Sequence, residues 1–342
     1  MFTRLRKRLS PILGRDSATW VGWLRRAVRD RARWPWHALT AALNRCPKRL
    51  SVQLQTVSAC NGRCVMCPYP ASWHRAHPGS MSDALFGRIL DQLAPWRLRK
   101  LCLYLQNEPF LDPKFIERLR AARECLRFDV LEVSTNASAL TDAKAQALAE
   151  VLEGVPHEVW VSFHGVDREG YTQTMGLDFD RTLANVVGLL KLAAARGLNV
   201  VLRGAGAALS AGEAVSPRHF SRADMEAFWE GVFREHGIER RPELVWFAYH
   251  GRSGSLGRGR RRRLLLGSYC ERIDQWLHVL YNGDVVLCCN DYHRRAVVGN
   301  LGEEELAAVL VSPRFRTLRL MAMGLHRSPP DFLCRLCTRS GG

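Results

Sequence analysis

The feature that most constrains the fold is an alternation of apolar strand candidates with helical stretches between residues 50 and 250. The six strand candidates are Ser51–Val57, Lys100–Leu105, Val130–Thr135, Glu158–Phe163, Asn199–Arg203 and Leu244–Tyr249. The helical stretches between them lie near residues 81–94, 114–126, 142–152, 180–196 and 221–236. Such alternation is typical of a parallel sheet with right-handed crossovers. Since six units are fewer than the eight of a closed barrel, we expect an α/β fold with an open, partial (β/α)6 TIM-like barrel.

Positive charge is concentrated before this alternation. The 342-residue chain has a net charge of +17, and residues 1–49 hold 13 Lys and Arg against two Asp. Their net charge is +11, which leaves +6 for residues 50–342. Trp20, Val21, Leu24 and Val28 form an apolar stripe at helical spacing, so residues 1–49 are predicted to be a basic helical extension. It either packs on the body with a solvated basic face or contacts an acidic partner, nucleic acid or a membrane surface.

The eleven cysteines are an odd number, and the chain shows no secretory signal and no apolar run of membrane-spanning length. We therefore expect a cytoplasmic protein without a transmembrane segment. In a reducing compartment, clustered cysteines indicate metal binding or catalysis rather than disulfides.

Three cysteines follow the first strand candidate directly. Cys60, Cys64 and Cys67 have the spacing C-x3-C-x2-C, and three thiolates within eight residues can hold one face of a cubane iron–sulfur cluster. Because a purely electron-transferring 4Fe–4S cluster takes four thiolates, three leave one iron open to an exogenous ligand. A zinc site is the alternative, although zinc ribbons favour pairs of CxxC.

This cysteine motif resembles that of the radical S-adenosylmethionine (radical SAM) superfamily, over about residues 50–340. The resemblance implies a partial (β/α)6 barrel, in agreement with the strand count. It also implies a 4Fe–4S cluster whose open iron binds SAM, which is cleaved reductively to a 5′-deoxyadenosyl radical that removes hydrogen from a substrate. Met66, before the last cysteine, fills the position that packs by the adenine in this superfamily.

The end of the second strand candidate carries a related motif. Gln106-Asn107-Glu108-Pro109 resembles the superfamily's Gly-Gly-Glu-Pro, which binds the SAM ammonium. Gln and Asn replace both glycines, while Glu108 and Pro109 are kept, so a carboxylate can still meet the cation. Without the family, the segment reads as an ordinary strand-to-helix turn.

Polar residues also end the later strands. Ser134 and Asn136 occupy the place of the superfamily's Thr-Asn-Gly, and Ser162 resembles a serine that contacts the SAM carboxylate. His164 could bind substrate or act as an acid–base group, or be a plain turn histidine. Arg203 closes the fifth strand and could pair with a carboxylate or assist catalysis. Parallel α/β folds place their chemistry at these strand ends.

A second set of cysteines follows residue 268. A β-hairpin is predicted at His278–Tyr281 and Asp284–Leu287 around Asn282–Gly283, with helices near 303–310 and 313–323. The spacing of Cys270, Cys288, Cys334 and Cys337 would suit zinc or a fully ligated cluster.

The same segment resembles the SPASM/Twitch extensions of radical SAM enzymes, and its cysteine order resembles 2-deoxy-scyllo-inosamine dehydrogenase-like enzymes. This implies a small α+β domain with one auxiliary 4Fe–4S cluster on those four cysteines. Cys289 is either spare or replaces Cys288.

Four regions follow from these patterns: the basic extension at 1–49, the radical SAM barrel at 50–250, a Gly/Arg-rich linker at 251–268 and the auxiliary-cluster domain at 269–342. The linker is either a solvated connector or a clamp for an anionic substrate or partner.

The favoured function is hydrogen abstraction from a small polyol, sugar or aminocyclitol, leading to oxidation or epimerisation, with the auxiliary cluster as electron acceptor. The alternatives are a radical SAM maturase of a ribosomal peptide or protein and a non-catalytic metal- or RNA-binding protein. The favoured partners are a small-molecule substrate and a reductant such as flavodoxin or ferredoxin, with nucleic acid disfavoured.

Overall fold

The computed structural model describes residues 32, 34–45, 49–206, 220–248, 251–256 and 270–337. Its strands form one sheet of nine, in the order β6-β5-β4-β3-β2-β1-β7-β8-β9. The strands are β1 (Ser51–Leu54), β2 (Arg97–Cys102), β3 (Arg127–Thr135), β4 (His157–Ser162), β5 (Val200–Gly206), β6 (Glu243–Ala248), β7 (Trp276–Val279), β8 (Asp284–Val286) and β9 (Val297–Asn300).

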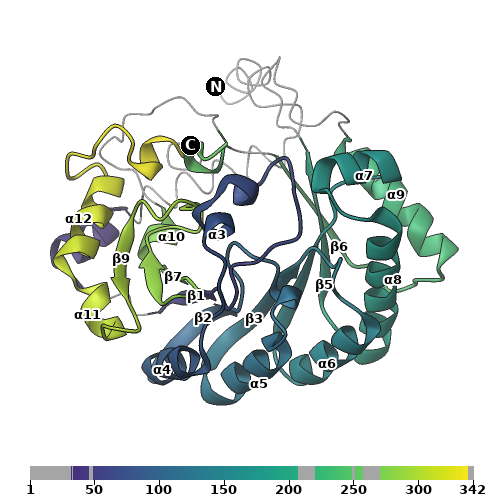
Figure 1. The fold of residues 1–342 in the computed structure, drawn as a ribbon, viewed down its shortest axis with the longest axis horizontal. Coiled ribbons are helices and arrows are strands. Elements are labelled where there is room, and N and C mark those ends of the chain that lie inside the picture. Colours follow the sequence, from purple (N-terminus) through teal and green to yellow (C-terminus); the bar gives the residue numbers. More distant parts are fainter. Residues whose placement is uncertain are drawn as a thin grey trace.

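Helices cover the outer side of this curved sheet, with α4 to α6 below and α7 to α9 to the right in Figure 1. The α-helices are α3 (Trp73–Ala76), α4 (Asp83–Leu93), α5 (Phe115–Cys125), α6 (Asp142–Leu152), α7 (Arg168–Met175), α8 (Phe179–Arg196), α9 (Arg222–Glu235), α10 (Glu271–Asp274), α11 (Leu306–Leu310) and α12 (Pro313–Ala322). Short 3₁₀ turns are η1 (Tyr69–Ala71), η2 (Pro109–Leu111), η3 (Arg252–Gly254) and η4 (Leu333–Arg335).

The predicted α/β class is confirmed, and all six predicted strands occur in order as parallel neighbours, from β1 to β6. The five predicted helices are α4, α5, α6, α8 and α9. Two helices within residues 50–250, the short α3 and α7, were not predicted. The stripe at Trp20–Val28, Tyr249 and residues 257–268 lie outside the described residues.

The predicted hairpin is present, since β7 and β8 pair in antiparallel register around a turn in which Gly283 has φ of 88°. A glycine tolerates this left-handed conformation without strain. The hairpin does more than form a small domain of its own, because β7 also pairs in parallel with β1 along Ser51–Leu54. The C-terminal part therefore extends the barrel sheet rather than standing apart from it.

The barrel strands alternate between two kinds of side chain. Val52, Leu101, Val133, Val161 and Leu202 are buried in the hydrophobic core. The intervening positions are polar and line a cavity on the inner side; they include Gln53, Lys100, Glu132, Ser134, Ser162 and Arg203. Successive side chains of a strand point to opposite faces, so one periodicity builds both the core and the site.

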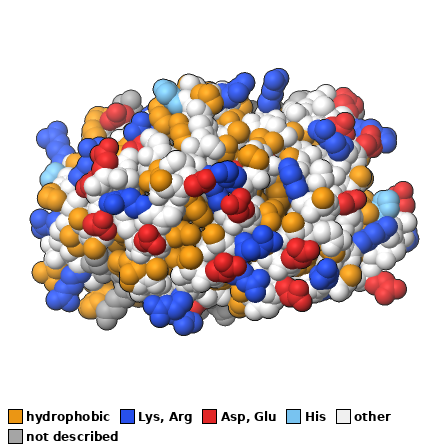
Figure 2. Space-filling view, turned by 60° about the horizontal axis from the view of Figure 1, so that its bottom comes forward, with side chains coloured by type: hydrophobic (Ala, Val, Ile, Leu, Met, Phe, Trp, Pro, Cys, Tyr) orange, Lys and Arg blue, Asp and Glu red, His pale blue; other side chains and the backbone are white. Residues whose placement is uncertain are grey.

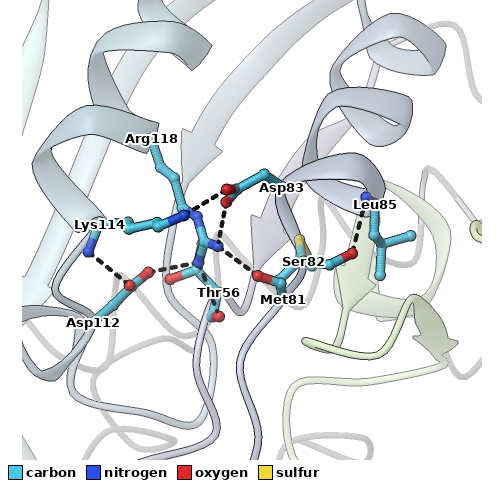
Figure 3. Close-up of polar contacts among 8 residues, drawn as sticks. All are labelled: Thr56, Met81, Ser82, Asp83, Leu85, Asp112, Lys114 and Arg118. Atoms are coloured by element: carbon cyan, nitrogen blue, oxygen red, sulfur yellow. Dashed lines mark hydrogen bonds and ion pairs between the residues drawn. The ribbon is translucent and has the colours of Figure 1, made fainter.

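A buried arginine joins several elements of the barrel (Figure 3). Arg118 of α5 donates from Nη1 to Asp112 Oδ2 at 2.8 Å and to Thr56 O at 3.2 Å, and from Nη2 to Asp83 Oδ1 at 3.2 Å. Its side chain also reaches Met81 O. One guanidinium therefore fixes the chain after β1, the start of α4 and the turn after β2.

On the face shown in Figure 2, basic and acidic side chains are interspersed with apolar ones. In the part of the chain that the structure describes, no helix is both long enough and apolar enough to cross a bilayer.

Candidate active site

The loop after β1 brings three cysteine sulfurs to the cavity. Cys60, Cys64 and Cys67 all line it. The loop is held against α7 by a backbone bond from Arg63 N to Met175 O at 2.8 Å. The end of α7 thus supports the loop from outside, although this short helix was absent from the sequence prediction.

These sulfurs fit an iron–sulfur cluster. A Cβ at Gly62 would lie 3.4 Å from Cys64 Sγ and 3.7 Å from Cys60 Sγ, so both sulfurs fold around the glycine. Burial raises the pKa of the Cys64 thiol to about 12 and that of Cys60 well above its ordinary value. Iron binding would deprotonate them, and three convergent thiolates suit a cubane with one open iron. Among the described residues, no three His, Cys, Asp or Glu side chains are placed to hold a single metal ion.

Glu108 lies at the centre of the site and is almost fully buried. Thr135 Oγ1 donates to its Oε1 at 2.6 Å, and the Asn136 amide donates to its Oε2 at 2.7 Å. Its own amide donates to Ala59 O at 2.9 Å, next to the first cluster cysteine. Burial raises the pKa of Glu108 to about 7, against the opposing effect of these hydrogen bonds. Glu108 therefore joins the ends of β1 and β3 and still lines the cavity.

Asn136 connects the end of β3 to the cysteine motif. Its Nδ2 donates to Asn61 Oδ1 at 2.9 Å, and Asn61 Nδ2 donates to Ser138 Oγ at 2.8 Å. Asn61 lies between the cysteines, and the sequence analysis did not select it. Its role in connecting the loop to Asn136 and Ser138 can be recognised only once the structure places the end of β3 beside the cysteine loop.

Arg203 of β5 projects across two neighbouring strands. Its Nη2 donates to Ser162 Oγ at 2.8 Å and to Ser134 Oγ at 3.1 Å. The guanidinium also lies over the rings of Trp160 and Phe247, at 5.7 and 5.6 Å from their centroids. Within the described residues, no carboxylate lies at ion-pair distance from Arg203, and its Nε has no hydrogen-bond partner. This cation is thus available to an anionic group of a ligand.

The remaining predicted residues also face this cavity, except Pro109. Met66, Asn107 and His164 line it, and Asn107 Nδ2 has no hydrogen-bond partner among the described residues. Pro109 is buried and begins η2. Burial, together with the charges of neighbouring arginines, lowers the pKa of His164 to about 3. The imidazole is therefore neutral near pH 7 but only weakly basic, and this low basicity disfavours it as a proton acceptor.

The C-terminal cysteines gather beside this cavity. Cys288 and Cys334 are buried, and Cys270 and Cys337 are partly so. Burial raises the pKa of Cys334 well above its ordinary value, and the neighbouring Cys270 and Cys337 thiols add to this effect. Burial also raises the pKa of Cys270 to about 11. A soft, buried thiol set of this kind suits a fully ligated auxiliary cluster.

Cys289 lines the cavity itself, and its thiol also lies beside that of Cys288. Its Sγ accepts a hydrogen bond from Arg272 Nη1 at 2.8 Å, while its carbonyl accepts one from Gln106 Nε2 at 2.7 Å. Cys288 instead accepts from the Asn290 amide at 3.4 Å. Gln106, which stands where the superfamily has glycine, thus ties the turn after β2 to the hairpin.

The inner wall of the cavity is polar. Lys100 forms ion pairs with Glu132 and, at 2.8 Å, with Glu158. Tyr104 OH donates to Glu132 Oε1. The Oε1 of Gln53 is buried and has no hydrogen-bond partner among the described residues. This wall offers both donors and acceptors to a ligand.

The sequence analysis missed these wall residues, although a signal existed. A lysine, a glutamate and a glutamine stand inside otherwise apolar strands, at positions that alternate with core residues. In the predicted linker, Arg252 of η3 lines the cavity and Ser253 is buried. The described part of that segment is therefore no solvated connector.

Two family models match the chain. Residues 54–206 match the radical SAM superfamily, and residues 270–338 match SPASM, an iron–sulfur cluster-binding domain. No curated protein sequence matches it.

Solved structures share this fold at low sequence identity. BtrN in complex with AdoMet and 2-DOIA is 18% identical with a TM-score of 0.55, over 86% of this chain and 94% of BtrN. Streptococcus suis SuiB bound to precursor peptide SuiA is 14% identical with a TM-score of 0.55, over 90% of this chain and 75% of SuiB. The structure of anSMEcpe with bound AdoMet is 15% identical with a TM-score of 0.51, over 79% and 83% of the two chains.

The two matched domains imply a 4Fe–4S cluster, SAM and an auxiliary cluster. The chain therefore contains a radical SAM domain at residues 54–206 and an iron–sulfur cluster-binding SPASM domain at residues 270–338.

Proposed function

We propose that this enzyme oxidises a small hydroxylated molecule, such as a polyol, sugar or aminocyclitol, with the auxiliary cluster as electron acceptor. The observation that carries the proposal is one cavity of about 510 Å³ that reaches from the three cluster cysteines to Arg272 and Cys289 of the SPASM domain. A cavity of this size takes small ligands. The electron donor and electron acceptor of such a reaction would then border the same bound substrate.

Cys60, Cys64 and Cys67 would hold the catalytic cluster, and Cys270, Cys288, Cys334 and Cys337 the auxiliary one. When bound, SAM and the two clusters supply a hydrogen-atom acceptor and an electron acceptor. Oxidation of a secondary alcohol to a ketone removes one hydrogen atom from carbon, one proton from oxygen and one electron. The protein must therefore orient the C–H bond and receive the proton.

We assign SAM binding to side chains at the ends of the barrel strands. Glu108 and Asn107 offer oxygen acceptors near the cysteine loop, which suits an ammonium group. Arg203, fixed by Ser134 and Ser162, offers a guanidinium to a carboxylate. Met66 and Asn136 line the same region and would contact the nucleoside part.

The polar wall would bind the substrate. Glu132, Gln53 and the Tyr104 oxygen are acceptors for substrate hydroxyls, Lys100 is a donor, and the Trp276 ring lines the same side. Glu108 and Glu132 are the carboxylates lining the described cavity. Because Glu108 stands at the cysteine loop and is proposed here for the SAM ammonium, Glu132 is assigned as acceptor of the hydroxyl proton, with Lys100 beside it to balance the charge.

Anaerobic assay of the reconstituted enzyme tests this proposal, with 5′-deoxyadenosine and oxidised product measured against panels of aminocyclitols, polyols and peptides. Cys64→Ala is expected to abolish 5′-deoxyadenosine, while Cys125→Ala, at an exposed cysteine outside both sets, keeps full activity. Glu132→Gln is expected to keep SAM cleavage and lower product formation about 10²-fold or more. Formation of 5′-deoxyadenosine by Cys64→Ala, or product from peptides alone, would contradict the proposal.

A further inference from the structure

The described part of the N-terminal extension is a helix with two apolar faces. The helix over residues 34–42 appears in purple beside α12 in Figure 1. Its inner face packs on the C-terminal part through Ala38 and Ala41, which are buried, and through an ion pair between His37 and Asp274. Just past the helix, Asn44 Nδ2 donates to Val311 O. The helix is thus fixed to the body by its inner face.

The outer face carries Trp36, Leu39 and Leu43, at helical spacing i, i+3 and i+7, which we name the apolar stripe. Their exposed fractions are 59%, 50% and 54%. Among the described residues, the other large apolar side chains with comparable exposure are Val311 and Leu325. The Val311 carbonyl accepts the bond from Asn44, so Val311 lies near the end of this helix. A clustered apolar surface on an otherwise mixed exterior marks an interaction site.

We propose that the apolar stripe seats the enzyme on an anionic bilayer surface. Exposed Trp and Leu on one side of a helix are suited to the boundary between headgroups and acyl chains. The same stretch of sequence, residues 1–49, has a net charge of +11, which attracts anionic lipid.

Other occupants fit less well. A second copy of this chain would bring two segments of +11 together, and their repulsion opposes association. Nucleic acid would satisfy the charge but leave the leucines and Trp36 in water. An anionic membrane matches both the apolar stripe and the positive charge of residues 1–49. This inference is separate from the proposed oxidation and goes beyond it.

Vesicle co-sedimentation of the full-length holoenzyme tests this binding. The protein is expected to sediment with vesicles of equal parts phosphatidylglycerol and phosphatidylcholine, and much less with phosphatidylcholine alone. Leu39→Ser/Leu43→Ser keeps every charge of the protein. This variant is expected to bind vesicles about tenfold more weakly or worse, because it lacks the two leucines that would be buried in the bilayer. Ala194→Ser/Ala195→Ser, at exposed positions of α8 across the molecule, is the matched control and binds like the parent.

Several results would overturn the proposal. One is equal vesicle binding by the leucine variant, which would leave only charge attraction from the basic segment. Another is a parent protein that is dimeric without lipid and becomes monomeric in the leucine variant, which would make the stripe a subunit interface. A third is tighter binding to duplex RNA or DNA than to the anionic vesicles, with the nucleic acid displacing the vesicles.

Discussion

Glu108 and His164 show how burial acts on single groups in the cavity. Burial disfavours the charged form of each, so the pKa of Glu108 rises to about 7 and that of His164 falls to about 3. The two pKa shifts make the stability of the fold depend on pH in opposite directions. Between about pH 4.5 and 7 the folded state holds the Glu108 proton more tightly, so stability falls as pH rises. For His164 the unfolded state binds more protons below about pH 6.5, so stability falls as pH drops.

The His164→Gln variant isolates the second effect. Its unfolding free energy, relative to the parent apoprotein, is expected to improve by about 1.4 kcal/mol for each unit of pH decrease between about 6 and 4. Urea titrations at several pH values measure this slope. Phe247→Leu alters the ring beside the imidazole, 5.9 Å away, without removing the titrating group, and keeps the parental slope. An unchanged slope in His164→Gln would contradict the shifted pKa.

Residues were predictable from sequence where a motif names them. The cysteines, Glu108, Ser134, Asn136 and Arg203 were selected from motif and strand end, and the structure brings them to one region. Lys100, Glu132 and Gln53 were not selected, because their meaning depends on which face of the sheet is enclosed. That face is decided by packing between strands distant in sequence, which no local pattern records.

At the scale of elements, Arg118 acts as a junction. It holds the chain after β1 through Thr56 O and the turn after β2 through Asp112, so α5 positions both the cysteine loop and the Glu108 turn (Figure 3). Buried ion pairs add little by themselves, but removal of one partner leaves an unbalanced charge in the interior.

Arg118→Met is therefore expected to destabilise the apoprotein by about 3 kcal/mol or more, measured by urea unfolding. Arg120→Met, at an exposed position of the same helix, changes stability by about 0.5 kcal/mol at most. Adding Asp112→Asn to Arg118→Met removes the stranded charge and should recover part of the loss. If the double variant is no more stable than Arg118→Met, the loss of stability comes from altered packing and not from the unpaired Asp112 carboxylate.

Most elements were predictable because they have strong periodicity, as α8 does with its capping Asp178 and left-handed Gly197. The helix α7 was missed because it is short and contains a glycine and two threonines, which weaken a helical pattern. The pairing of β7 with β1 was missed for a different reason. It joins segments more than 220 residues apart, as in Ser51 with Trp276, and sequence periodicity contains no information about such partners.

At the scale of the whole molecule, the two matched domains share a sheet. β1 has β2 on one side and β7 on the other, so the first barrel strand is central to both domains. Tyr281 of the hairpin packs against Gly79, and its OH donates to His77 O at 3.0 Å. The segment between the cysteine loop and α4 thus rests on the SPASM domain.

We expect the apoprotein to unfold in one cooperative transition. Tryptophan fluorescence and far-UV circular dichroism in urea should give the same midpoint, and Leu277→Ala in β7 should lower both midpoints together. Two separated transitions, or a Leu277→Ala effect on only one of them, would mean that the domains fold independently.

The Gln106 amide spans the joint between those domains, at the edge of the cavity, by its bond to the Cys289 carbonyl. A glycine there could make no such tie. With it, the turn that carries Glu108 is fixed to the segment that carries Cys288 and Cys289, so a side-chain bond joins the two matched domains in addition to their shared sheet.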